Sequence, residues 1–118
     1  MTHDALAVAK AAILTERDGL TTLADRLDTR FVHAIDMLEK VSSGGGRVIV
    51  TGMGKSGHVA RKIAATLAST GTPAQYVHPG EASHGDLGMI TERDAVIAMS
   101  NSGEAPELSD IIAYTRRF

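Results

Sequence analysis

The feature that most constrains the fold is a short apolar run that ends in a glycine-rich turn. Residues 48–50 read Val-Ile-Val, and residues 52–57 read Gly-Met-Gly-Lys-Ser-Gly. A β-branched run that ends at glycine is typical of a strand buried on both faces of a parallel sheet. Residues 56–69 then show a helical pattern that stops at Gly71. The sequence therefore predicts a strand, a loop and a helix in that order.

Two further short runs extend this pattern. Residues 75–77 and 95–99 predict a second and a third strand. Strands that alternate with helices indicate the α/β class with a parallel sheet. If the first strand lies between the other two, the carboxyl ends of strands one and three meet at the topological switch point. A last helix is expected to begin at Pro106 and to turn three apolar side chains inward: Leu108, Ile111 and Ile112.

The first 46 residues predict a pair of helices. An apolar residue recurs every seventh position within residues 3–27, and Asp28 can cap a second helix. Such a pair is expected to pack within the fold or in a subunit interface. With 118 residues, one domain is expected, with helices over 1–46 and a βαβ core over 47–118. The chain stops in mid-helix at 114–118, so we expect the front part of a longer domain, truncated after about three strands. The alternative is that a partner covers the open edge of this small sheet.

Composition narrows the range of partners. The net charge is −2 and aromatic residues make up 3%, so no nucleic acid partner is expected. The sequence has no cysteine, which argues against a disulfide framework. It shows neither a secretory signal nor an apolar stretch long enough to span a bilayer. We therefore expect a cytoplasmic protein without a membrane partner.

The loop at residues 52–57 is expected to hold phosphate, and two common uses of such a loop fit poorly. A nucleoside triphosphate loop requires glycine at position 49, which is Ile49. The dinucleotide pattern G-x-G-x-x-G is present, but it also requires an acidic residue at the end of the second strand. Glu81 comes only after Pro79, past that strand. The glycine part of the dinucleotide motif is therefore present, and its acidic residue is not.

A second loop favours a smaller ligand. Residues 100–106 read Ser-Asn-Ser-Gly-Glu-Ala-Pro and again join a strand to a helix. Hydroxyls and backbone N–H groups at a helix start form an anion site. Two such loops at one edge of the sheet suit a compact monophosphate with a polar body. Both loops can also be read as ordinary tight turns, because glycine and serine are common there.

Four segments together resemble the sugar isomerase (SIS) domain, and more narrowly the arabinose-5-phosphate isomerases. They are Gly-Met-Gly-Lys-Ser-Gly-His at 52–58, His-Pro at 78–79, Ser-His-Gly-Asp-Leu-Gly at 83–88 and Ser-Asn-Ser-Gly-Glu at 100–104. The resemblance implies a flavodoxin-like parallel sheet, of which this chain supplies the first three strands. It implies interconversion of ribulose 5-phosphate and arabinose 5-phosphate in lipopolysaccharide precursor biosynthesis, without a cofactor or a required metal. It also implies a homo-oligomer, a dimer or a tetramer.

The resemblance implies two sets of site residues. Lys55, His84 and Glu107 match catalytic positions, and Lys55 at the mouth of the first loop could also neutralise phosphate. The substrate-binding set consists of Gly54, Ser56, Ser100, Asn101, Ser102, Gly103 and Glu104. Family members often have Thr or Ser where this chain has Ala105, so one hydroxyl contact is expected to be missing.

Three alternatives stay open at this point. His78, Glu81, His84 and Asp86 could be read as a metal cluster, although Pro79 and Gly80 interrupt it. The domain could also be a non-catalytic phosphosugar-binding regulatory module, since SIS domains serve in that role too. A nicotinamide-dependent dehydrogenase is the third alternative.

Overall fold

The N-terminal helices form where the sequence predicts them. The computed structural model describes residues 4–117 and divides into two compact units, with the boundary after Ile35. Helix α1 spans Ala5–Arg26 and helix α2 spans Thr29–Ser43. Asp28 Oδ1 accepts a hydrogen bond of 2.9 Å from the Arg30 N–H, which confirms the predicted cap of α2. The Arg30 side chain also donates to this carboxylate and lowers the pKa of Asp28.

The heptad-spaced apolar stripe of α1 lies open to solvent. Leu6, Ile13, Leu20 and Leu27 are between 55% and 67% exposed, and no described residue of α1 is buried. In α2, by contrast, Leu38 and Val41 pack against a core cluster of the second unit, to which both belong. The helical pattern is therefore confirmed, while the stripe of α1 has no cover within residues 4–35.

The second unit contains the predicted three-stranded parallel sheet. Strand β1 (Val48–Gly52) lies between β2 (Ala74–Tyr76) and β3 (Ala95–Met99). Every residue of β1 is buried, as its β-branched sequence predicts. The other elements of this unit are the helices α3 (Gly54–Ser69), α4 (Pro79–Ser83) and α5 (Ser109–Thr115), and the 3-10 turns η1 (Asp86–Met89) and η2 (Pro106–Leu108).

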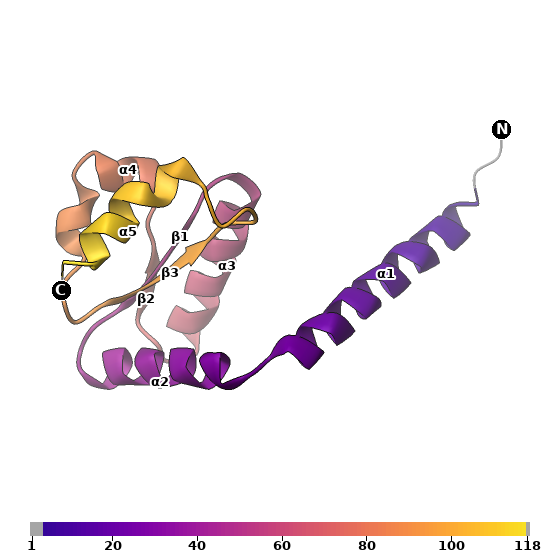
Figure 1. Ribbon diagram of the computed structural model, residues 1–118, viewed down its shortest axis with the longest axis horizontal. Helices are drawn as coiled ribbons and strands as arrows, with labels where there is room; N and C mark the ends of the chain where they lie inside the picture. Colours follow the sequence, from indigo (N-terminus) through magenta and orange to yellow (C-terminus); the bar gives the residue numbers. More distant parts are fainter. Residues whose placement is uncertain (1–3, 118) are drawn as a thin grey trace. The chain divides into compact units, whose positions relative to one another are not determined.

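Alternate residues of β1 serve two cores on opposite faces of the sheet. Val48 and Val50 pack with Ala60 and Ala64 of α3. Ile49 points the other way, into a cluster that includes residues of α4 and α5. Figure 1 shows α3 on one face of the sheet and α4 with α5 on the other. This two-sided cover is what a parallel sheet requires.

The structure corrects two details of the last and third helices. Ile112 is 40% exposed, so the prediction that it faces the core is wrong. Leu108 and Ile111 are buried as predicted, because residues three apart share one face of a helix and the next residue does not. Helix α3 begins at Gly54, two residues before the predicted start. Within residues 78–94, α4 and η1 add short helical turns that the sequence pattern did not predict.

Asp94 ties together the starts of two strands, and its loss should weaken the fold. Its carboxylate accepts from the Arg47 N–H at 2.8 Å and from the Thr91 N–H at 2.9 Å, and its side chain is 3% exposed. The change Asp94→Ala removes the acceptor of the part-buried Arg47 N–H and that of the more exposed Thr91 N–H. We expect a loss of about 2 kcal/mol in the free energy of unfolding. Urea unfolding of this variant beside Glu92→Ala, an exposed neighbour, measures it, and equal midpoints would contradict the expectation.

Candidate functional site

The register of the sheet brings the two polar loops together. Strands β1 and β3 pair from Val48 with Ala95 through to Gly52 with Met99. Gly52 and Met99 are the last residues of their strands, so both loops leave the sheet from one paired position. Neighbouring strands lie about 4.8 Å apart. The two loops therefore start side by side at the carboxyl edge of the sheet, where ligands bind in such folds.

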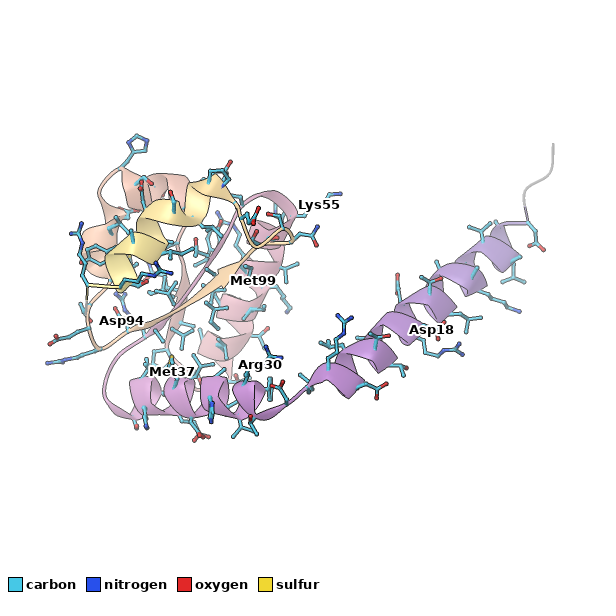
Figure 2. All side chains as sticks on the ribbon, in the orientation of Figure 1. Asp18, Arg30, Met37, Lys55, Asp94 and Met99 are labelled. Atoms are coloured by element: carbon cyan, nitrogen blue, oxygen red, sulfur yellow. The ribbon has the colours of Figure 1, made fainter. Side chains whose placement is uncertain are left out.

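Both loops line one cavity of about 360 Å³. Figure 2 shows Lys55 and Met99 close to the same end of the sheet. This volume lies within the range of small-ligand pockets. The lining residues are Met53, Lys55, Ser56, Met99, Ser100, Asn101, Ser102 and Ala105.

The second loop is held in shape by its own serines. Ser100 Oγ accepts from the Gly103 N–H at 3.0 Å, and Ser102 Oγ accepts from the Glu104 N–H at 3.1 Å. The two hydroxyl oxygens lie 3.3 Å apart. A hydroxyl that accepts from the backbone keeps its own hydrogen for another partner. Because the contact between the two hydroxyls engages at most one of their hydrogens, the loop keeps at least one O–H for a ligand.

The first loop is fixed by close backbone packing and by a tyrosine. A Cβ added at Gly57 would lie 2.7 Å from the Gly52 carbonyl oxygen, so only glycine fits there. The Tyr76 hydroxyl donates to that same oxygen at 2.8 Å. The Arg61 guanidinium lies over the Tyr76 ring, 4.1 Å from its centroid. The loop therefore enters α3 along one defined path, with the first N–H groups of the helix free of helical partners.

The structure brings most of the expected binding residues together. Lys55, Ser56, Ser100, Asn101 and Ser102 all line the cavity. Gly54 opens α3, Gly103 lies in the second loop, and Glu104 contributes its N–H to that loop's turn. Their role in binding stays a prediction.

Two of the three expected catalytic residues lie outside this lining. His84 caps the end of α4 and Glu107 lies in η2, and both side chains are exposed. Neither is among the residues that line the cavity. Of the three expected catalytic residues, Lys55 alone lines the cavity as this chain forms it.

Three lining residues were not predicted from the sequence to bind the ligand. Met53 and Met99 supply apolar surface, and each is half-buried. Their position was a usable signal, because each directly adjoins a polar loop at the end of a strand. Ala105 also lines the cavity, where the expected hydroxyl is absent.

The charged lining of the cavity consists of a single positive side chain. Lys55 is the one charged residue in the lining, which favours an anionic ligand. The alternative of a metal cluster finds no support, because no group of three or more His, Cys, Asp or Glu side chains within residues 4–117 could hold a metal ion. His78, Glu81 and Asp86 line a different, smaller cavity with Arg61, and His84 is not part of it.

The parallel sheet, with a cavity at the carboxyl ends of β1 and β3, places the chain among the α/β folds that hold ligands at a topological switch point. Comparison with known proteins gives the family: residues 43–118 match the SIS domain, and the chain belongs to that family. It is 53% identical over 109 residues to the arabinose 5-phosphate isomerase KdsD of Pseudomonas aeruginosa, and 51% identical over 108 residues to that of Escherichia coli K12. These matches cover 92% of this chain but 32% of each relative, so the chain spans about a third of their length.

Solved structures give the same picture. The chain matches a protein of Escherichia coli CFT073, described as c3406 in complex with A5P, with a TM-score of 0.88 and 39% identity. That match covers 99% of this chain and 61% of the other. A phosphosugar isomerase from Bacteroides fragilis, described as involved in capsule formation, matches with a TM-score of 0.80 and 30% identity over 94% of this chain and 58% of the other. Within the described part of the chain, no helix is long and apolar enough to cross a membrane.

Proposed function

We propose that this chain is the front part of an SIS domain that interconverts ribulose 5-phosphate and arabinose 5-phosphate. The observation that carries the proposal is the single cavity formed by both loops, with Lys55 and three serines in its lining. Support also comes from the 53% identity to an arabinose 5-phosphate isomerase and from the structural match to a complex with A5P. The proposal includes a cytoplasmic homo-oligomer that acts in lipopolysaccharide precursor biosynthesis.

The phosphate group is proposed to bind between the two loops. Ser56, Ser100 and Ser102 would donate their hydroxyl hydrogens to its oxygens, and Asn101 would donate from its amide. The free N–H groups at the start of α3 would add to these donors. Anchoring one end of the sugar in this way holds its carbonyl end in a defined position, which is the main requirement for selective proton transfer.

The reaction itself is a proton transfer between neighbouring carbons. A base removes a proton from the carbon next to the carbonyl, which gives an enediolate, and an acid then protonates the former carbonyl carbon. A second proton leaves the neighbouring hydroxyl and ends on the former carbonyl oxygen, while a positive group stabilises the negative oxygen that forms in between. Lys55 is proposed to stabilise that oxygen or the phosphate. His84 and Glu107 are proposed as proton carriers on the strength of the family resemblance, although neither lines the cavity in this chain.

That separation is the observation that favours a second candidate function. A domain that holds the sugar phosphate but brings no acid–base pair to it would act as a phosphosugar-binding regulatory module. The two functions share the cavity and differ in turnover.

An isomerase assay separates them. Ribulose 5-phosphate is incubated with this chain and with the longer protein that contains it, and formation of arabinose 5-phosphate is followed. Turnover by the longer protein supports the isomerase. Saturable binding of arabinose 5-phosphate without turnover in either protein supports the regulatory module, and absence of both would overturn the sugar-phosphate site itself.

A further inference from the structure

We infer that Thr51 is a positioning residue whose hydroxyl sets the direction in which residues 77–84 leave the sheet, and with it the position of His84. This inference rests on the proposed function, because His84 is a proton carrier only in the proposed isomerase. Among residues 4–117, Thr51 is the one polar residue that is buried as a whole. It lies in β1 and is not part of the cavity lining. Its hydroxyl therefore serves the protein itself rather than the ligand.

The Thr51 hydroxyl joins β1 to the chain after β2, at the point where the backbone ladder between the two strands ends. The Val77 N–H donates to the Val50 carbonyl at 3.0 Å. Two residues further along both strands, the same register requires an N–H from residue 79, which is Pro79 and has none. Beyond the Val77 N–H, a side chain makes the connection: Thr51 Oγ1 donates to the Val77 carbonyl at 2.6 Å, in a buried place. The hydroxyl thus fixes the last peptide group before the chain turns into α4.

The short segment from Val77 to His84 is hydrogen-bonded along its length. The His78 carbonyl accepts from the Ala82 N–H at 3.0 Å, and the His84 N–H donates to the Glu81 carbonyl at 3.1 Å. Because a peptide unit is planar, the direction of the Val77 carbonyl also sets the direction of the next N–H, and so the entry of the chain into α4. A rotation at Val77 is therefore carried through α4 to His84.

Apolar packing holds α4 on the sheet without fixing its direction. Val77 and Ala82 lie in the same buried cluster as Ile49. Hydrophobic contacts of this kind are non-directional, whereas a hydrogen bond requires its donor to be aligned with the acceptor. The change Thr51→Val keeps the apolar contacts and removes the hydrogen bond. We therefore expect α4 to stay on the core while His84 loses its defined position.

The cavity between the two polar loops is built from other segments. Its lining residues follow β1 and β3, and none of residues 77–84 is among them. The first loop is held by the Tyr76 hydroxyl, on the face of the sheet that α3 covers, and the change at Thr51 leaves that bond in place. Loss of the Thr51 hydroxyl should accordingly lower turnover without lowering the affinity for a sugar phosphate. A merely structural role would lower neither in the folded protein.

The experiment compares Thr51→Val and Thr51→Ser with the unchanged sequence in the longer protein that contains this chain. We expect kcat with ribulose 5-phosphate to fall on the order of 10- to 100-fold in Thr51→Val, because a small displacement of a catalytic group costs that much. The dissociation constant of arabinose 5-phosphate, measured by calorimetry, should stay within about twofold. Thr51→Ser keeps a hydroxyl, so it should recover kcat to within about threefold of the unchanged protein.

Leu38→Ala is the matched control for loss of stability. Leu38 packs against the core cluster on the face that α3 covers, and it does not line the cavity. We expect this variant to lower the urea midpoint of unfolding, as Thr51→Val does, and to leave kcat unchanged. Far-ultraviolet circular dichroism verifies that each variant is folded under the assay conditions.

Three results would overturn the inference and leave the proposed function intact. They are an unchanged kcat in Thr51→Val, an equal loss of kcat in Thr51→Val and Leu38→Ala, and a loss of affinity in Thr51→Val in place of a loss of kcat. Absence of turnover in the unchanged longer protein would remove the proposed function and the inference together. If Thr51→Val does not fold, Thr51→Cys replaces it, because a thiol is a weak donor. Its kcat should then lie below that of Thr51→Ser, and equal values would contradict the inference.

Discussion

Replacing Gly46 with alanine is expected to lower the free energy of unfolding by about 3 kcal/mol or more. Gly46 is buried at the turn between α2 and β1, where its N–H donates to the Val41 carbonyl at 2.9 Å. An added Cβ would lie 2.6 Å from the Arg93 carbonyl carbon and would overlap the Arg93 oxygen. Both contacts are with backbone, so neither can be relieved by turning a side chain. The two segments would have to separate, which disturbs the start of β1 and β3 together.

Urea unfolding followed by circular dichroism measures this loss. Gly88→Ala is the matched control, because no heavy atom lies within 4 Å of its added Cβ. We expect that control to stay within about 0.5 kcal/mol of the unchanged chain. Equal midpoints for Gly46→Ala and Gly88→Ala would show that the backbone near Arg93 yields without cost.

Replacing Lys55 with alanine is expected to weaken binding of arabinose 5-phosphate on the order of 100-fold. Lys55 is the one charged residue in the lining of the cavity, and hydrogen bonds to charged groups contribute about 1.5–3 kcal/mol. If Lys55 also stabilises the developing oxygen charge, turnover in the longer protein should fall on the order of 100- to 1000-fold. Lys55→Arg keeps the charge but not the compact ammonium, so it should recover part of the affinity.

Lys62→Ala is the matched control, since Lys62 is an exposed lysine on the same helix and does not line the cavity. Calorimetry gives the affinities and the isomerase assay gives turnover. A loss shared by Lys62→Ala and Lys55→Ala would point to general electrostatic attraction, and no loss in either would remove Lys55 from the site.

The sequence was sufficient to predict the sheet and the meeting of the two loops. The β-branched run at 48–50 predicted a buried central strand, and its pairing with both neighbours is what the structure shows. The glycine and serine residues after each strand predicted both loops, because a few consecutive residues suffice to recognise a strand end that is followed by a helix start. The same reasoning located five of the cavity's lining residues.

What the sequence could not predict depends on contacts between distant residues. The Tyr76 hydroxyl reaches the Gly52 carbonyl across 24 positions, and Asp94 reaches the Arg47 N–H across 47. No local pattern encodes such pairs, since each depends on how the strands are aligned. The short helix α4 was missed for a related reason: its Pro-Gly start reads as a turn, and its Ala82 becomes a core residue only through tertiary packing.

The pairing of Gly52 with Met99 makes the geometry of the cavity a property of strand alignment. A slip of β3 along β1 by a single residue would carry Ser102 about 3.3 Å past Lys55 and turn every β3 side chain to the opposite face. Substitutions at the far end of the ladder, near Ala95, can therefore alter ligand affinity without touching the ligand. Random mutagenesis followed by selection for higher or lower ligand affinity should therefore yield substitutions at the amino ends of the strands as well as in the loops.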